Sequence, residues 1–197
     1  MADLTNPAMT WSMIVELIRA GLFSLAHFCG GSMGLAIVVA TIAFRAIMFP
    51  FTLRAARRQA TAPARKPVLD FGTLAQFPVG LGLFAAIRGI GERAGGFLWM
   101  KTLARPDGLF ALLAALVAGG LSWLGASAQT LNGAPAGSAA RTTAALMSVL
   151  FAGGLTLAML LHVPAGVAVY SITSSLAGFG ERRLVARLTA SKAKAAT

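Results

Sequence analysis

The chain has 197 residues, of which 57% are hydrophobic and only 12% are charged, and its mean hydropathy is +0.75. Soluble domains carry about 25% charged residues, so this composition excludes a soluble globular protein and indicates a membrane protein. The net charge of +11 would suggest a nucleic-acid partner in a soluble protein, but the positions of the basic residues here indicate membrane orientation instead. No DNA partner is expected.

Residues 1–30 are predicted to form an outer N-terminal segment that contains an amphipathic helix over residues 11–28. Polar and apolar residues recur there on opposite helical faces: Ser12, Glu16, Arg19 and His27 on one, and Ile14, Ile18, Leu22 and Leu25 on the other. Such a helix lies in the plane of the membrane interface. A spanning helix is the alternative, less favoured because the segment carries charges and a histidine. The first residues lack a basic segment ahead of an apolar core, so no cleaved signal is expected.

Five apolar windows follow, each long enough as a helix to cross a hydrocarbon core of about 30 Å. They cover residues 31–53, 69–88, 108–128, 142–163 and 164–180. The predicted fold class is therefore an all-α membrane protein with five transmembrane helices in a core of residues 31–183. The last two spans are joined by "HVPAG", which predicts a tight antiparallel hairpin whose turn lies at the outer face.

Basic residues gather in two places, after the first span and after the last: Arg54, Arg57, Arg58, Arg65 and Lys66, then Arg182, Arg183, Arg187, Lys192 and Lys194. By the positive-inside rule both segments are cytoplasmic, which places the N-terminus outside and makes residues 184–197 a basic cytoplasmic tail. Orientation and attraction to anionic lipid are the favoured roles of this tail. Contact with RNA or a ribosome is the alternative.

Arg45 is the single charged residue between positions 31 and 53. A guanidinium in such a span costs about 3 kcal/mol on insertion scales, so it should face a polar cavity, a partner or the interface. Thr41 and Thr52 lie on the same helical face. Snorkelling towards the interface near Arg54 is the alternative for Arg45.

Polar and small residues also share one face in two other spans: Thr73, Gln76 and Gly80 in the second, and Ser171, Ser174, Ser175 and Gly178 in the last. Together with Arg45, these residues indicate that polar side chains line a space between the spans. For individual hydroxyls, hydrogen bonds between helices are the alternative. Ser174/Gly178, Gly30/Gly34 and Gly91/Gly95 also have the four-residue spacing of close helix packing, although such pairs are common at this glycine content.

The sequence offers little for catalysis. The six acidic residues all lie outside the deep part of the predicted spans, which leaves no paired intramembrane carboxylates: Asp3, Glu16, Asp70, Glu92, Asp107 and Glu181. His27, His162 and the single Cys29 are isolated from one another, and the paired glycines are not followed by the Lys-Ser/Thr of a phosphate loop. An enzyme is therefore not expected, and neither a metal nor a cofactor is expected.

Four segments in order resemble the YidC family of membrane protein insertases. The first span, "GLAIVVATIAFRAIMFPFTLRAARRQ", contains an arginine and closes on Phe-Pro-x-Thr-Leu, and "AQFPVGLGLFAAIR" opens the second span on Gln-x-Pro. "FLWMKTLARPDG" is similar to the family's Phe-Leu-Trp segment before a Pro-Asp turn, and "HVPAGVAVYSITSSL" to its Pro-Ala-Gly hairpin followed by Tyr and Ile-Thr-Ser.

The resemblance implies an insertase or chaperone that passes hydrophobic segments of nascent membrane proteins into the bilayer without nucleotide. Its five helices would enclose a hydrophilic groove open to the cytoplasm and to lipid. The absence of a transit peptide rich in Arg and Ser favours a bacterial inner membrane, with an organelle descended from a bacterium as the alternative. Arg45 would attract acidic residues of the substrate, Gln76 matches the groove glutamine, and Thr41, Ser171, Ser174 and Ser175 would complete the groove. A ribosome or a translocon could be a further partner through the basic tail.

The chain also departs from the family pattern. The long charged hairpin between the first two core spans is replaced by "QATAPARKPV" and its surroundings, and serines stand at 171 and 175 in place of the usual aromatic residue and asparagine. A specialised assembly factor or scaffold with reduced insertase activity is therefore the alternative function. A solute channel or transporter is disfavoured, because five spans do not divide into similar halves and no intramembrane acid is available for ion coupling.

Overall fold

The computed structural model is helical, and it describes residues 7–61, 81–82, 84–90, 97–128 and 139–195. The helices are α1 (Pro7–Phe28), α2 (Met33–Thr61), α4 (Gly108–Ala128), α5 (Ala139–Leu160) and α6 (Ala165–Ala195). Residues 84–90 are also helical, and an isolated bridge pairs Phe97 with Met100 in the segment before α4. The prediction of an all-α membrane protein is confirmed.

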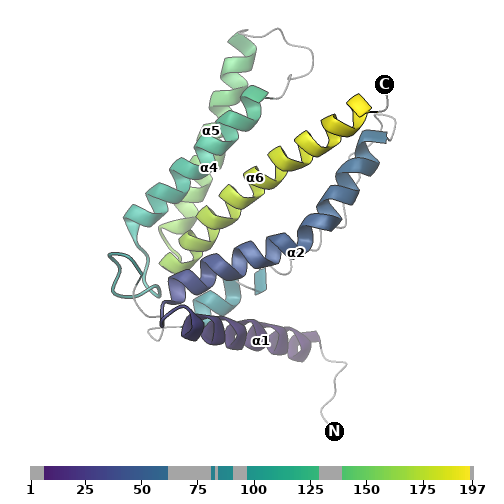
Figure 1. Ribbon diagram of the computed structural model, residues 1–197. Coiled ribbons are helices and arrows are strands. Elements are labelled where there is room, and N and C mark those ends of the chain that lie inside the picture. The colour runs from purple at the N-terminus through teal and green to yellow at the C-terminus, as the bar shows by residue number, and fades with distance from the viewer. Residues whose placement is uncertain (1–6, 62–80, 83, 91–96, 129–138, 196–197) are drawn as a thin grey trace.

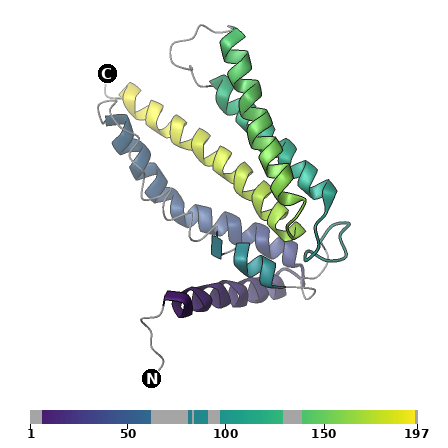
Figure 2. The same ribbon diagram turned by 180° about the vertical axis from the view of Figure 1, so that it is seen from behind.

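Helix α6 lies between α2 on one side and α4 on the other, and α4 and α5 pair as a hairpin (Figures 1 and 2). The α2 and α6 ribbons end close together at the end of the molecule opposite α1, whereas α1 lies across the end where α2 and α6 begin (Figure 1). Helix α2 is visibly bent, and it contains Pro50, whose missing N–H and bulky ring kink a helix interior.

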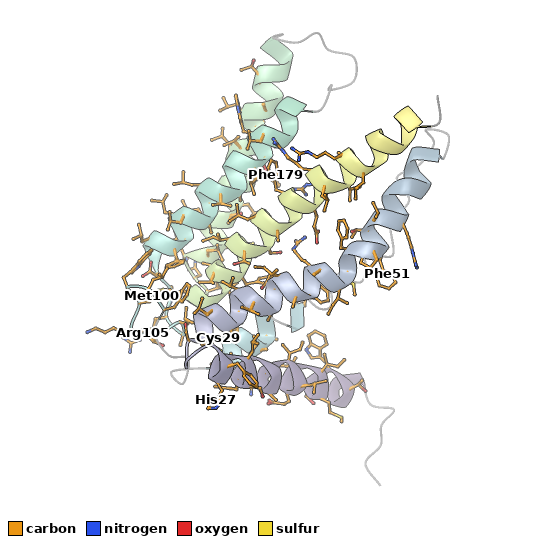
Figure 3. The ribbon with its side chains drawn as sticks, in the orientation of Figure 1. His27, Cys29, Phe51, Met100, Arg105 and Phe179 are labelled. Carbon is orange, nitrogen blue, oxygen red and sulfur yellow. The ribbon has the colours of Figure 1, made fainter. Side chains whose placement is uncertain are left out.

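The buried apolar core lies at the α1 end of the molecule. Leu22 of α1, Ile37 of α2 and Ile87 of the 84–90 helix belong to it, as do Leu103 and Val167. Figure 3 places His27, Cys29, Met100 and Arg105 at this same end and Phe51 and Phe179 farther towards the other.

Backbone hydrogen bonds attach the segment before α4 to the start of α6. The N–H of Ala165 donates to the carbonyl of Arg105 (3.0 Å), and that of Gly166 donates to the carbonyl of Leu103 (3.1 Å). The first N–H groups of a helix have no partner within the helix, so this segment satisfies two of them. The predicted outer Pro-Asp turn therefore has a structural role: it also supplies Asp107, whose carboxylate caps α4 by accepting from the N–H of Phe110 (2.9 Å).

Among the described residues, three helices are long and apolar enough to cross a membrane: Thr10–Phe28, Met33–Arg54 and Gly108–Gly125. The last two agree with the first and third predicted spans. For the second predicted span, positions 69–80 and 83 lie outside the described residues. In the fourth, the apolar part of α5 is the shorter stretch Ala145–Leu160. The fifth was predicted to end at residue 180, but α6 continues as a helix to Ala195, through most of the segment expected as a tail.

Large apolar side chains cover the outside of α4 and α5. Exposed members of this surface are Leu109, Leu112, Leu113, Leu116, Trp123 and Leu124 on α4, and Leu146, Met147, Leu150, Phe151, Leu155 and Met159 on α5. Soluble proteins rarely expose an apolar surface of this extent, whereas lipid chains solvate it well. The hairpin therefore has the surface of a membrane-embedded pair.

The two helices of this hairpin pack closely where glycines meet. A Cβ added to Gly153 would lie 3.2 Å from the carbonyl oxygen of Ala115, and one added to Gly119 would lie 3.2 Å from the side chain of Val149. Small residues let membrane helices approach in this way. Of the glycine pairs singled out from the sequence, Gly91/Gly95 lies outside the described residues, and Gly34 of the Gly30/Gly34 pair packs against the ring of Phe97.

Helix α1 packs against the core with Ile18, Leu22 and Leu25, which belong to the predicted apolar face, and with Val15. Val15 and Leu22 are buried, Ile18 packs against the core, and Ile14, which was expected on the apolar face, is 43% exposed. Because α1 is apolar on more than one side, the sequence pattern alone does not select the stripe that packs on the core. The length and composition of α1 also suit a spanning helix, and its interfacial placement remains a prediction.

Candidate functional site

Arg45 lies on the face of α2 that packs against α6. It follows Thr41 by one helical turn, and the α6 residues opposite it are Ser174, Gly178 and Glu181. Their spacings of four and three residues put these three positions on one face of α6. The candidate site is therefore built from one face of each of two helices.

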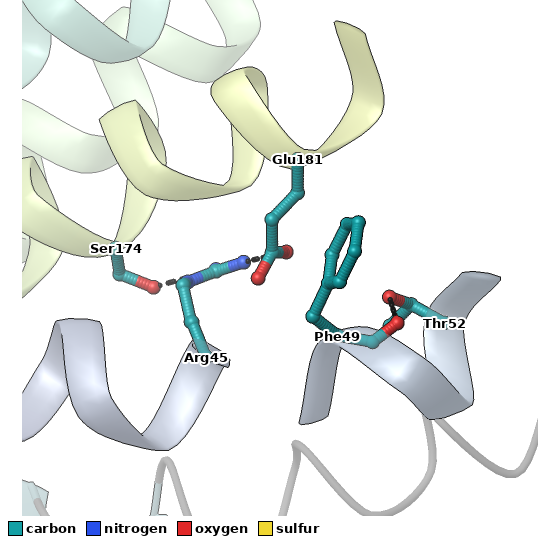
Figure 4. A network of polar contacts seen from close by, with 5 residues as sticks. All are labelled: Arg45, Phe49, Thr52, Ser174 and Glu181. Atoms are coloured by element: carbon teal, nitrogen blue, oxygen red, sulfur yellow. Dashed lines mark hydrogen bonds and ion pairs between the residues drawn. The ribbon is translucent and has the colours of Figure 1, made fainter. Parts of the chain in front are cut away.

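The guanidinium of Arg45 donates two hydrogen bonds to α6 (Figure 4). Nη1 lies 2.9 Å from Oε2 of Glu181, and Nη2 lies 2.8 Å from Oγ of Ser174. The side chains of Arg45 and Glu181 are 19% and 18% exposed. Charge-assisted hydrogen bonds of this length are the strong ones, and here they neutralise a charge that would be costly in an apolar environment.

Gly178 provides the space in which this guanidinium lies. A Cβ on Gly178 would lie 2.8 Å from Nη1 and 3.2 Å from Cζ of Arg45. The arginine head therefore rests directly on the backbone of α6, and a side chain at position 178 would displace it. Ser174 and Gly178, which the sequence places on one polar face and which also have the spacing of close helix packing, here accommodate a charged group.

A small pocket of about 30 Å³ adjoins the guanidinium. Its walls combine three polar and two aromatic side chains: Thr41, Arg45 and Ser174, with Phe44 and Tyr170. A space of this size holds one or two water molecules, and the polar groups around it can bind them. The Thr41 hydroxyl is buried and donates to the carbonyl of Ile37 (2.6 Å), which leaves its oxygen able to accept.

The structure thus brings together three of the six predicted groove residues: Thr41, Arg45 and Ser174. Ser171 and Ser175 are half-buried on α6 and are not part of the pocket lining. Gln76, with the rest of the polar face predicted for the second span, lies outside the described residues.

Thr52 was predicted to share the polar face of Arg45, but its hydroxyl donates to the carbonyl of Phe49 (2.8 Å) within α2, as Figure 4 also shows. Thr173 bonds in the same way to Val169 (2.8 Å) in α6. Hydroxyls of this kind are satisfied within their own helix, as membrane helices permit, and need no groove.

Sequence reasoning missed Glu181 as the partner of Arg45. The last predicted span ends at residue 180, which places Glu181 on the cytoplasmic side and outside any pair of intramembrane carboxylates. The helical spacing of Ser174, Gly178 and Glu181 was nevertheless readable from the sequence. Combined with an unpaired arginine in another span, it could have suggested the ion pair.

Basic side chains follow this pair along both α2 and α6. Arg54, Arg182, Arg183 and Arg187 are exposed there. Arg183 also lies over the ring of Phe179, 4.7 Å from its centroid, in a cation–π contact. The Arg45–Glu181 pair therefore lies between the apolar core and a positively charged end.

Residues 71–192, more than half of the chain, match the family described as the 60Kd inner membrane protein. The match includes α4 and α5 and most of α6, with Ser174, Gly178 and Glu181. It begins after α2, so Arg45 lies outside it. No curated protein matches the chain.

Proposed function

The chain belongs to the 60Kd inner membrane protein family, the family of YidC-type insertases, and from that premise we propose how it handles its substrates. The family implies a non-enzymatic role in membrane insertion. The proposal is that apolar segments of newly made membrane proteins pass into the bilayer along a positively charged groove at Arg45, without nucleotide. The observation that carries it is a guanidinium held between α2 and α6, beside a small polar pocket.

The charge at Arg45 would act on the hydrophilic part of a substrate. A polar tail that crosses the bilayer loses its hydration, and a fixed cation with bound water inside the membrane shortens the apolar path. A substrate carboxylate that reached about 4 Å from the guanidinium would gain on the order of 4 kcal/mol at an effective dielectric constant of 20. This attraction offsets part of the cost of dehydrating the carboxylate.

The free energy for insertion would come from the substrate itself. Leu, Ile, Phe and Val each contribute about −0.5 kcal/mol at the centre of a spanning helix, so a segment of about 20 such residues gains roughly 10 kcal/mol on entering lipid. Partitioning of this size needs no nucleotide. The insertase then has only to lower the barrier for the polar tail.

The proposed groove is wider than the described pocket. In this arrangement five helices enclose it, Gln76, Ser171 and Ser175 complete its lining, and it opens to the cytoplasm and to lipid. The exposed arginines that follow the Arg45–Glu181 pair on α2 and α6 support a cytoplasmic location for that part of the molecule, with the N-terminus outside. Nascent membrane proteins and the bilayer are the proposed partners, with a ribosome or a translocon at the basic end of α6.

Replacement of Arg45 tests this function. In proteoliposomes that contain the purified protein, Arg45→Ala should impair insertion of a single-span substrate whose translocated tail carries an aspartate, and Arg45→Lys should largely preserve it. Arg19→Ala is a matched control, because Arg19 is also half-buried and paired with a glutamate, but on α1 at the other end of the molecule. Equal insertion by all three variants and the unchanged protein would show that the charge of Arg45 has no part in insertion.

A specialised assembly factor is the second candidate function. It is supported by the ion pair itself, which neutralises Arg45 in the absence of substrate, and by the short connection between the first two core spans. Such a protein would copurify with one stable membrane partner. It would also fail to restore growth to cells depleted of their own insertase, which the proposed insertase should do.

A further inference from the structure

Arg45 is already bound to a carboxylate of its own chain. We infer that Glu181 is a specificity-determining residue of this site: its carboxylate holds the position that a substrate carboxylate would take, so that an acidic segment must displace it. This inference rests on the proposed function, because it concerns which substrates the groove at Arg45 accepts.

The geometry makes the two carboxylates competitors. The Glu181 carboxylate accepts from Nη1 at 2.9 Å, and the Ser174 hydroxyl accepts from Nη2 at 2.8 Å, so both terminal nitrogens of the guanidinium are engaged by α6. The backbone at Gly178 lies beneath the same group. A second carboxylate placed against this guanidinium would therefore meet the negative charge of Glu181 at close range, and like charges at that distance repel.

The charge balance has the same consequence at longer range. One positive and one negative group sum to zero, so the pair attracts a distant acidic tail far less than a lone arginine would. A neutral tail is unaffected by this cancellation. Glu181 should thus reduce the preference for acidic tails that Arg45 alone would produce.

The position of Glu181 also allows it to leave Arg45 at low cost. It immediately precedes the exposed basic residues Arg182 and Arg183 on α6, and Arg187 follows one turn later. A carboxylate released from Arg45 would remain in a positively charged and more hydrated region. Exchange of one carboxylate for another would keep the guanidinium paired throughout, whereas an unpaired buried charge is strongly unfavourable.

The Glu181→Gln variant distinguishes two roles of Glu181: competition with a substrate carboxylate for Arg45, and positioning of the Arg45 side chain. The glutamine amide oxygen can still accept from Nη1 and hold the guanidinium in place, while the competing negative charge is gone. Insertion of a substrate with an aspartate in its tail should rise about three- to tenfold, the range expected for loss of a partly exposed charge competitor. A matched substrate with asparagine at that position should be inserted as before.

The experiment uses the full-length protein in proteoliposomes and scores protease protection of the translocated tail, for the aspartate and the asparagine substrate in parallel. Glu16→Gln is the matched control, because Glu16 pairs with Arg19 at 2.7 Å on α1, away from the site, and its loss should change neither substrate. In an Arg45→Ala background, Glu181→Gln should not increase insertion of the aspartate substrate. A decrease with the aspartate substrate, or an equal change with both substrates, would overturn the competitor role and indicate that Glu181 only positions Arg45.

The outcomes separate this inference from the proposed function. If Arg45→Ala impairs the aspartate substrate but Glu181→Gln brings no gain, the groove charge stands and the competitor role fails. If Arg45→Ala changes the insertion of neither substrate, both the proposed function and the competitor role of Glu181 fail. If the Glu181→Gln protein does not accumulate in membranes, Glu181→Asp replaces it, because the shorter side chain withdraws the carboxylate from Arg45 by one methylene. Insertion of the aspartate substrate should then rise by a smaller factor. Unchanged or lower insertion would overturn the inference.

Discussion

Gly178→Ala probes the contact between Arg45 and α6 with the smallest possible change. The added Cβ would lie 2.8 Å from Nη1 of Arg45, closer than atoms of this kind approach. Because the guanidinium is the end of a flexible side chain, it should move and leave the two helices where they are. The cost is then the loss of the hydrogen bonds to Glu181 and Ser174.

The expected magnitude follows from two opposing effects. Hydrogen bonds to charged groups contribute about 1.5–3 kcal/mol each, and the displaced guanidinium should lose most of one or both. Alanine stabilises a helix interior over glycine by up to about 1 kcal/mol. We therefore expect a net loss of about 1–2 kcal/mol in the free energy of unfolding, together with reduced insertion of substrates that have an acidic tail.

Two comparisons make this prediction specific. Gly180→Ala adds the same methyl group two residues later, where no atom lies within 4 Å, and should be neutral or slightly stabilising. In an Arg45→Ala background, Gly178→Ala should also become stabilising, because the group it displaces is gone. The free energy of unfolding is measured by denaturant in detergent for five proteins: the unchanged protein, Gly178→Ala, Gly180→Ala, Arg45→Ala and the Arg45→Ala/Gly178→Ala double variant. A similar loss from Gly178→Ala with and without Arg45 would refute the proposed contact.

Two further predictions concern the scaffold, each checked by the same unfolding assay. Asp107→Ala removes the side-chain acceptor for the N–H of Phe110 and should cost about 1 kcal/mol; Asp107→Asn, which can still accept, should recover most of it, and an equal loss from both would argue against the cap. Gly153→Val places methyl groups against the carbonyl of Ala115, 3.2 Å from the Cβ position, and should cost about 2 kcal/mol, whereas Gly154→Val points into open space. Equal losses at 153 and 154 would mean that the α4–α5 crossing does not depend on the glycine.

The sequence predicted well those features that depend on local pattern. The start of α4 agreed with the structure because Asp107 caps it and an apolar run follows. The first core span was recognised from its apolar length and its single arginine, and Met33–Arg54 meets the criteria for a spanning helix. These signals are local in the chain, so one sequence is enough to read them.

The features that were missed depend on packing or on helix continuity. Hydropathy falls after residue 180, yet α6 continues, because helix formation requires backbone geometry and good helix formers rather than apolar residues. The partner of Arg45 is 136 positions away in the chain, and no local pattern links the two. The burial of Val15 beside Leu22 depends on the packing of α1 against α2, because α1 is apolar on several sides.

The contacts between α2 and α6 change in character along the two helices. This change bears on whether a substrate carboxylate could replace Glu181 at Arg45. Near their first turns the contact is apolar and close: a Cβ on Gly166 would lie 3.4 Å from Ile37, and both residues are buried. Farther along, the contact is the ion pair of Arg45 and Glu181, whose side chains remain about one-fifth exposed. An apolar contact has no replacement in water or in a polar tail, whereas a carboxylate can be replaced by another carboxylate at little net cost. If a substrate carboxylate replaces Glu181 at Arg45, as we propose, the core at the α1 end would keep the two helices together during that exchange.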